Sequence, residues 1–450
     1  MSQTFRSLHH RDYRLWFSGA LVSNTGTWMQ RVAQDWLVIQ VLTDGSGTAG
    51  GITTGLQFGP ILLLAPVAGT VADRFPQRRT LMVTQAVMGL LGLVLGALVI
   101  SGAAQLWHVY VLAALLGCAS AIDGPVRQTF VGQLVPREDL PNAIGLNSAS
   151  FNSARLVGPA LAGVLIAWIG TGPVFVLNAL SFVAPLVMLH LMRPAEPVPR
   201  PKPAKGSGGM REGLAYVRAR PDLVAIFVLV GVVGTFGLNF QLTSALMTSV
   251  EYGTGSAGYG LAGTVLAVGS LAGALVAARR ERPRYRLLVG AAVAFGVLAS
   301  LAAVMPTYGL YLLVLPFMGL ASLTLLTTAN ATVQMSTEPA VRGRVMALYM
   351  SLVQGGTVLG GPFVGWVGTA FGPSWSVLVG SIPSALVGVA VGVFLLRRAR
   401  VRVSVSWRGA PRVRLVPVPE RGRAQGHQAD GGDTTPTPTA IKDSAPAIKD

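Results

Sequence analysis

The chain has 450 residues, of which 51% are hydrophobic and only 12% are charged, and its formal net charge is +17. Soluble globular domains carry about 25% charged residues. The composition therefore excludes soluble enzymes, nucleic-acid-binding modules and secreted disulfide scaffolds. The single cysteine, Cys118, allows neither an internal disulfide nor a cysteine-based metal cluster.

Long apolar stretches recur along the chain, each able to cross the roughly 30 Å hydrocarbon core of a bilayer as a helix. They predict an all-α membrane protein with 12 transmembrane helices. In chain order we expect these helices at residues 14–41, 51–72, 80–101, 106–126, 140–169, 172–192, 222–249, 256–278, 286–304, 308–334, 341–369 and 373–396. Two connections are so short that Gly and Pro must form the turns, near residues 169–172 and 369–373.

Basic residues occur in alternate loops of this arrangement. The other loops contain no Lys or Arg and carry only Asp44 and Glu251. Because short translocated loops reject basic residues, both termini are predicted to be cytoplasmic, in a multi-pass protein of the cell membrane. Topology and attraction to anionic lipid headgroups then account for the basic excess, rather than nucleic-acid binding. A cleavable signal peptide is not expected, since Arg31 and Asp35 interrupt the first apolar run.

An internal repeat divides the chain into two halves. The segment from Pro136 to Pro159 is repeated from Pro339 to Pro362 at an offset of 203 residues. The repeat predicts two pseudo-symmetric halves of six helices each. The expected organisation is an N-terminal half at 1–192, a cytoplasmic linker at 193–221, a C-terminal half at 222–396 and a disordered cytoplasmic tail at 397–450. A short surface helix is expected at 210–220, and the tail is either a solvated end or a regulatory docking segment.

Four motifs give the halves a family resemblance. They are Gly69-Thr-Val-Ala-Asp73-Arg74-Phe-Pro-Gln-Arg78-Arg79, Gly158-Pro159, Thr27-Trp28-Met-Gln-Arg31-Val-Ala-Gln-Asp35-Trp36 and Ala121-Ile-Asp123-Gly-Pro125-Val-Arg127-Gln128. Together they resemble the major facilitator superfamily, in particular its branch of drug:proton antiporters and siderophore exporters. The resemblance implies alternating access between the halves. It also implies that a monomer uses the proton gradient as its energy source, without a cofactor or a metal.

Ionisable residues inside the predicted spans are few, and Arg31, Asp35, Asp123 and Arg155 are the clear ones. A charge at the bilayer centre costs about 2.5–3.5 kcal/mol, so each should face a partner or a cavity. Arg31 and Asp35 share a helix face. Asp35 is therefore a candidate for proton coupling, and the alternatives are a substrate contact or a permanent ion pair with Arg31. Arg155 is expected to meet either an anionic substrate or Asp35.

Other residues are candidates for the cavity, for gating and for packing. Substrate-cavity candidates are Trp28, Gln34, Asn152, Asn239 and Gln241. Gating candidates are Gly69, Asp73, Arg74, Arg78, Arg79, Asp123 and Arg127. Asp73 is placed to pair with Arg127 as a gate latch, the alternative being a simple turn stabiliser. Gly158, Pro159, Gly361 and Pro362 are expected to let helices of the two halves pack closely.

Taken together, these patterns indicate an exporter that exchanges protons for small amphipathic or lipophilic molecules, and not an enzyme. One alternative is a dedicated exporter of a single metabolite such as a siderophore. Another is a membrane sensor or scaffold without transport. An ATP-driven pump is excluded because no Gly-x-x-x-x-Gly-Lys-Ser/Thr loop is present. The expected partners are a small-molecule substrate, protons and the lipid bilayer, with no nucleic acid. Because the same cycle runs in either direction, export itself rests on the resemblance.

Overall fold

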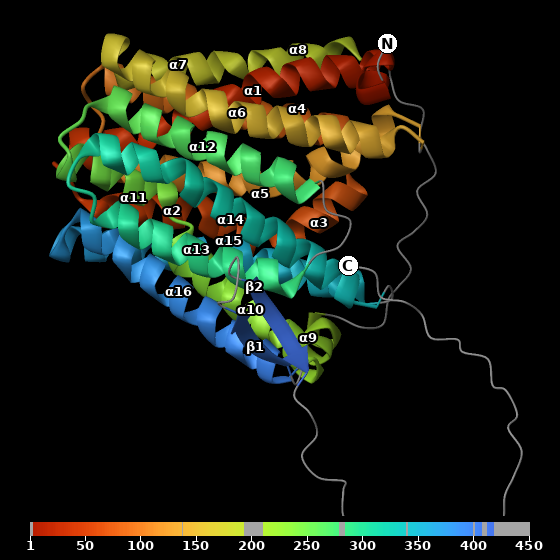
Figure 1. Ribbon diagram of the computed structural model, residues 1–450. Helices are drawn as coiled ribbons and strands as arrows, with labels where there is room; N and C mark the ends of the chain where they lie inside the picture. Colours follow the sequence, from red (N-terminus) through yellow and green to blue (C-terminus); the bar gives the residue numbers. More distant parts are fainter. Residues whose placement is uncertain are drawn as a thin grey trace, which may run out of the picture. The chain divides into compact units, whose positions relative to one another are not determined.

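A computed structural model describes residues 3–136, 138–192, 210–278, 284–338, 341–398, 401–406 and 412–417. Residues 1–395 form one unit, a bundle of long helices (Figure 1). Its helices run, in chain order, over η1 (Gln3–His9), α1 (Arg11–Trp36), η2 (Leu37–Leu42), α2 (Gly47–Leu63), α3 (Ala65–Arg74), α4 (Gln77–Ile100), α5 (Leu106–Leu134), α6 (Leu140–Ile169), α7 (Thr171–Ser181), α8 (Val183–Leu191), α9 (Met210–Ala219), α10 (Pro221–Val232), η3 (Val233–Gly237), α11 (Phe240–Leu246), η4 (Met247–Glu251), α12 (Ser256–Ala278), α13 (Tyr285–Ala303), α14 (Tyr308–Ser336), α15 (Arg342–Phe371) and α16 (Pro373–Arg398).

Every predicted span is helical, and α6 and α12 have the predicted bounds. Several spans consist of more than one helix. The second is divided at Leu64 and the sixth at Phe182, each close before a proline that lacks the backbone N–H the helix needs. The seventh contains two widened π-helical turns, η3 and η4. Gly170 and Gly372, at φ of 80° and 101°, form the two tight turns.

Nine candidate membrane spans are present within the described residues. The helices α1, α2 and α15 are not among them. In α1 the reason is its charged and polar residues, and α2 is only 17 residues long. The count of twelve spans therefore remains a prediction.

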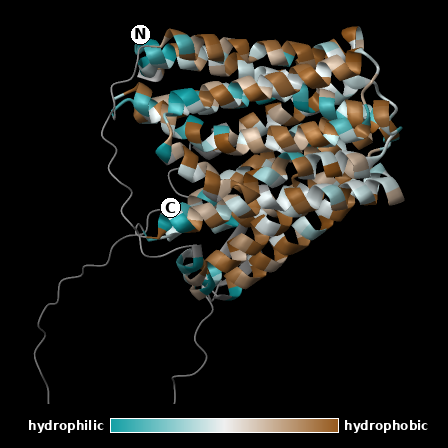
Figure 2. Ribbon diagram, turned by 180° about the vertical axis from the view of Figure 1, so that it is seen from behind, coloured by the Kyte–Doolittle hydropathy of each residue, from teal (hydrophilic) through white to brown (hydrophobic). Residues whose placement is uncertain are grey.

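We call α1–α8 the first half and α10–α16 the second half. The two halves pack together mainly through α2 against α15 and α6 against α12, and Figure 1 shows α12 running beside α6. Figure 2 shows apolar residues along the middle of the helices and more polar residues toward their ends. Large apolar side chains remain exposed there, such as Leu90, Val297 and Leu386, as expected of surfaces that face lipid.

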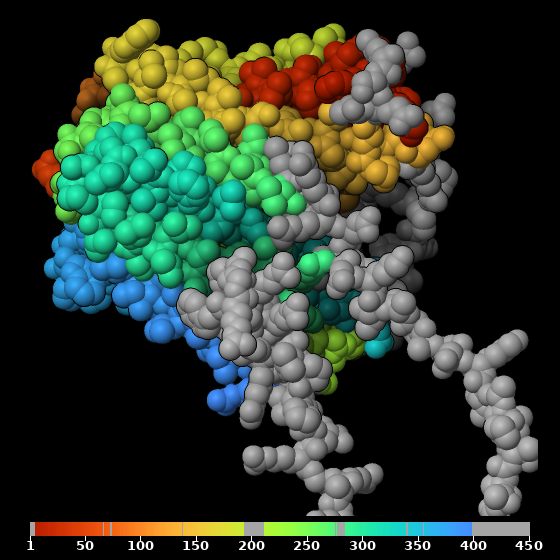
Figure 3. All heavy atoms as spheres, in the orientation of Figure 1, coloured from red at the N-terminus to blue at the C-terminus, as the bar shows by residue number. Residues whose placement is uncertain are grey.

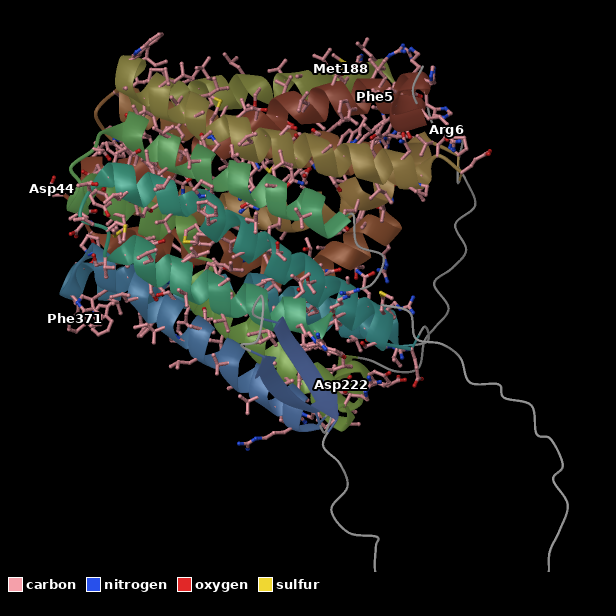
Figure 4. All side chains as sticks on the ribbon, viewed as in Figure 1. Phe5, Arg6, Asp44, Met188, Asp222 and Phe371 are labelled. Carbon is pink, nitrogen blue, oxygen red and sulfur yellow. The ribbon has the colours of Figure 1, made fainter. Side chains whose placement is uncertain are left out.

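The two ends of the bundle are distinguished by labelled residues in Figure 4. Arg6 and Asp222 lie at one end, which we call the amino-terminal end. Asp44 and Phe371 lie at the other, which we call the opposite end.

Residues 396–450 form a second unit, within the tail that was expected to be disordered. Here β1 (Val401–Ser406) pairs antiparallel with β2 (Arg412–Pro417), with Val403 opposite Leu415. Valine alternates with polar residues in β1, which is the period of a strand. The rest of the predicted tail and the linker at 193–209 lie outside the described residues.

Candidate functional site

A cavity of about 420 Å³ lies midway along the bundle between the two halves. Three helices of the first half line it, together with α11, α12, α14 and α15 of the second half and the residues just before α11. The lining residues are Trp28, Arg31, Val32, Thr54, Phe58, Ile61, Phe151, Arg155, Pro159, Leu238, Asn239, Phe240, Gln241, Leu242, Ser244, Tyr259, Gly263, Leu266, Ala267, Leu326, Val353 and Thr357. Its size is that of a site for one small molecule.

Two arginines lie close to the ring of Trp28 in this cavity. The guanidinium carbon of Arg31 is 4.8 Å from the centre of the Trp28 ring, and that of Arg155 is 5.6 Å from it. Arg31 also lies 5.2 Å from the ring centre of Phe58. Within the described part of the chain, neither arginine forms an ion pair with a carboxylate. Neither of the two pairs given above as alternatives, Arg31 with Asp35 and Arg155 with Asp35, is therefore formed within the 4.0 Å limit of a salt bridge.

Asp35 is instead bound by a residue of the other half. The hydroxyl of Tyr259, on α12, donates to Oδ2 of Asp35, on α1, over 3.0 Å. Tyr259 is buried, and its hydroxyl also lies 3.2 Å from the backbone oxygen of Gln241. Asp35 itself does not line the cavity, but Tyr259 does. The carboxylate thus lies one side chain away from the space where a substrate would bind.

The break between η3 and α11 supplies Asn239 to the cavity, and the first turn of α11 supplies Gln241. Nδ2 of Asn239 donates to the backbone oxygen of Thr235 over 2.8 Å. Oδ1 of Asn239 is buried and has no hydrogen-bond partner among the residues that the structure describes. Such an atom is costly unless a bound molecule satisfies it.

Glycine and proline on α6 bring the surrounding helices close to the cavity. A Cβ on Gly158 would lie 2.5 Å from Cβ of Trp28, so only glycine lets α1 approach this near. The backbone oxygen of Pro159 lies 2.5 Å from where a Cβ of Gly260 would stand. This motif therefore places Trp28 against α6 and lets α12 of the second half pack against the same helix.

Small residues also close the opposite end of the bundle, between α2 and α15. A Cβ on Gly47 would lie 2.6 Å from the backbone oxygen of Gly365, and one on Gly51 would lie 2.8 Å from Cα of Pro362. Gly361 faces Gly51 across the same contact. Atoms of the two halves meet without a visible gap at this end on the face shown in Figure 3.

Hydrogen bonds between the halves reinforce this closure. Nε2 of Gln40 donates to Oγ of Ser249 over 2.7 Å. Thr48 binds Oγ1 of Thr369 through both its backbone N–H, over 2.9 Å, and its hydroxyl, over 3.1 Å. These contacts lie at the opposite end, beyond the cavity as seen from the amino-terminal end.

Arg127 pairs with Asp123 within the first half. Nη2 of Arg127 lies 2.8 Å from Oδ2 of Asp123, and Nη1 donates to Asn24. Thr84 and Gln85 each donate to Oδ1 of Asp123 over 2.8 Å. Asp123 is buried, and its network joins α4 and α5 and reaches α1. The partner predicted for Arg127 was Asp73, whose side chain lies outside the described residues.

The remaining gating candidates lie near the amino-terminal end. Arg74 and Arg79 are exposed, and Nη2 of Arg78 donates to the backbone oxygen of His190 over 3.0 Å. Gly69 faces open space, since a Cβ there would meet nothing within 4 Å. Their gating role remains a prediction.

Five of the cavity candidates line the cavity, namely Trp28, Arg31, Arg155, Asn239 and Gln241. Gln34 and Asn152 do not line the cavity. Gln34 is buried elsewhere in α1, and Asn152 donates to the backbone oxygen of Ser148 on its own helix. Tyr259 and the lining phenylalanines were not predicted from the sequence. A tyrosine inside an apolar span needs a hydrogen-bond partner for its hydroxyl, and that rule was a usable signal for Tyr259.

The sequence as a whole matches known transporters. A family model described as "Transmembrane secretion effector" matches residues 2–423. The chain is 25% identical to the Staphyloferrin A transporter of Staphylococcus aureus over 346 residues, which are 75% of this chain and 85% of that protein. It is 27% identical to the multidrug efflux pump Tap of Mycolicibacterium fortuitum over 401 residues, 84% of this chain and 94% of that one. It is 24% identical to the enterobactin exporter EntS of Escherichia coli O1:K1 over 400 residues, 87% and 94% of the two chains.

Solved structures share the fold. A bacterial homolog of the human lysosomal transporter Spinster, in an inward-facing conformation, superposes with a TM-score of 0.66 at 16% identity, covering 86% of this chain and 95% of that one. A POT family transporter in complex with 5-aminolevulinic acid also gives 0.66, at 13% identity over 87% of this chain and 99% of that one.

Proposed function

This chain belongs to the transmembrane secretion effector family of major facilitator transporters, and from that premise we propose that it exports small amphipathic molecules by alternating access in exchange for protons. The family makes it a multi-pass transporter of the cell membrane rather than an enzyme. Its relatives named above include a multidrug efflux pump and an enterobactin exporter, in line with export. The proposal includes twelve spans, cytoplasmic termini, a monomer as the working unit and the proton gradient as the energy source.

Alternating access is supported by the position of the cavity relative to the closure. The cavity lies between the halves, and the contacts of Thr48 with Thr369 close the bundle at the opposite end. With cytoplasmic termini, this is the conformation that takes up cargo from the cytoplasm. Rocking of one half against the other would break the closure and release the cargo outside.

Proton coupling is supported above all by the hydrogen bond between Tyr259 and Asp35, which crosses from one half to the other. An ionised carboxylate is a stronger acceptor than a neutral one, so this bond holds the empty, deprotonated carrier closed at the opposite end. Cargo that displaces Tyr259 frees the halves to rock. In the outward-open state Asp35 takes up a proton, and the neutral side chain can then be buried again at low cost.

The test compares Asp35→Asn with Asp44→Asn in proteoliposomes. Asp44 is a matched control, because it is an acidic residue in a turn at φ 47°, a conformation that asparagine adopts readily. Lipophilic cations, macrolides and siderophores serve as test cargo, with and without an imposed pH gradient. We expect Asp35→Asn to lose gradient-driven accumulation and to keep downhill exchange, and Asp44→Asn to keep both.

Each other outcome contradicts a stated part of the proposal. Gradient-driven accumulation by Asp35→Asn would remove Asp35 from the coupling role. A wild-type protein that transports downhill but ignores the pH gradient would be an uncoupled carrier. A wild-type protein that transports none of these compounds in either mode would favour a membrane sensor or scaffold.

A further inference from the structure

We propose that the cavity selects planar aromatic anions, an inference that rests on the proposed export function and specifies its cargo. The observation behind it is the pair of arginines around Trp28. Both line the cavity, from α1 and from α6, and neither forms an ion pair within the described part of the chain. An unpaired charge inside a membrane protein is costly, so an occupant that brings a negative charge is favoured over a neutral one.

The carboxylate nearest the cavity forms no ion pair with either arginine within the described part of the chain, and Asp35 acts on Arg31 only from a longer distance. Asp35 accepts its hydrogen bond from Tyr259, which stands between it and the cavity. No acidic side chain is found among the described lining residues. A cationic molecule would therefore face Arg31 and Arg155 without a counter-charge in contact, whereas an anion would meet two guanidinium groups that can each donate in a fork.

Aromatic rings give the site its shape preference. Trp28 packs edge-on against Phe151 at 5.7 Å between ring centres, and Phe58 and Phe240 line the same space. A flat ring can stack among these side chains while its charged group reaches the arginines.

A pair of fluorescent probes tests the charge requirement directly. 1-Anilinonaphthalene-8-sulfonate and N-phenyl-1-naphthylamine share the same ring system and N–H, and differ by the sulfonate. Binding is measured to the full chain in nanodiscs, with empty nanodiscs subtracted, and ethidium serves as an aromatic cation. We expect the sulfonate to bind about tenfold or more tightly than the neutral analogue, as for charge-assisted hydrogen bonds.

Variants assign that preference to the two arginines. Arg31→Gln and Arg155→Gln should each weaken sulfonate binding by about tenfold and leave the neutral analogue within about twofold. Arg155→Lys keeps the charge and should retain most of the affinity. Arg286→Gln is the matched control, because Arg286 is exposed outside the cavity and its replacement should change nothing. Equal thermal unfolding midpoints would show that the variants are folded.

Two results would overturn the inference. One is equal binding of the sulfonate and the neutral analogue by the wild type, and the other is tighter binding of ethidium. Failure of this inference is separable from failure of the proposed function. If ethidium is exported with the pH gradient while the sulfonate does not bind, the exporter stands and the anion preference fails. If the sulfonate binds as expected but no compound is transported, the anion site stands and the exporter fails.

Discussion

Tyr259 on α12 and Asp35 on α1 form a hydrogen bond of 3.0 Å that connects the two halves beside the cavity. The same hydroxyl lies 3.2 Å from the backbone oxygen of Gln241, within its own half. A tyrosine hydroxyl has one hydrogen to donate, so the two acceptors compete for it. Protonation makes the Asp35 carboxyl a weaker acceptor. It therefore favours the hydrogen bond from Tyr259 to the backbone oxygen of Gln241, within the second half. Tyr259 is thus placed to convert a proton on Asp35 into a looser contact between the halves.

Replacing Tyr259 by phenylalanine removes this competition and keeps the ring. We expect Tyr259→Phe to reduce gradient-driven transport by about tenfold, the size of effect for a lost hydrogen bond to a charged group. Downhill exchange should be unaffected. Tyr252→Phe is the control, since the Tyr252 hydroxyl donates to Met305 within the second half. Transport in both modes is measured in proteoliposomes, and undiminished coupling in Tyr259→Phe would contradict the role given to this bond.

A disulfide at the opposite end should lock the carrier. The hydroxyls of Thr48 and Thr369 are 3.1 Å apart, which suits a cysteine pair at these positions. In a Cys118→Ser background, which removes the only native cysteine, oxidised Thr48→Cys/Thr369→Cys should transport at less than about a tenth of the wild-type rate. Reductant should restore it. Thr48→Cys alone, treated with the same oxidant, is the control, and full transport by the cross-linked protein would refute alternating access through this end.

The helices could be predicted because the length of an apolar stretch and the basic residues in the loops are local features that can be read directly from the sequence. Proline breaks such as that before Pro66 follow from local chemistry too, but their effect on the second span was not predicted. The residues that line the cavity were harder to predict, because a sequence does not tell which face of a helix turns inward. Gln34 and Asn152 are polar residues like Asn239, yet only Asn239 lines the cavity.

Pairing of the charges was the least predictable part. Arg31 and Asp35 have the spacing of a helical ion pair and do not form one, and Asp35 instead accepts a hydrogen bond from Tyr259 of the other half. Asp123 and Arg127 have the same spacing and do pair. The difference lies in what the neighbouring helices offer, and this depends on the tertiary arrangement.

The buried pair of Asp123 and Arg127 should matter for stability. Asp123→Ala leaves the guanidinium of Arg127 without its counter-charge and removes the acceptor of Thr84 and Gln85. Breaking a buried pair in this way costs about 3–5 kcal/mol of unfolding free energy. The measurement is unfolding in mixed micelles of sodium dodecyl sulfate. The control is Asp12→Asn, which breaks an exposed pair with Arg11 at 3.3 Å and should cost at most about 1 kcal/mol of unfolding free energy. Equal losses of stability in the two variants would show that burial of the pair does not matter here.

Asp139, just before α6, holds the N-terminal segment against the bundle. It accepts from the His10 ring over 2.7 Å and forms an ion pair with Arg6, while Ser7 binds its backbone oxygen. The hydrogen bond from His10 and the nearby guanidinium of Arg6 hold the pKa of Asp139 below its ordinary value, against the opposing effect of partial burial. Because the folded-state pKa is depressed, the stabilisation is present above the ordinary carboxyl pKa of about 3.9 and is lost as the pH falls through the lower folded value.

The docking of η1 should therefore resist mild acid and fail only below about pH 4. A spin label at Phe5→Cys, in the Cys118→Ser background, reports it, since Phe5 is exposed and lies next to Arg6 (Figure 4). We expect an unchanged spectrum from pH 8 to 5 and a mobile component that grows at lower pH. Asp139→Asn, which cannot ionise, should show that component already at pH 7, and Asp12→Asn should behave as the wild type. A mobile component that grows in the wild type already between pH 8 and 5 would contradict the role given to Asp139.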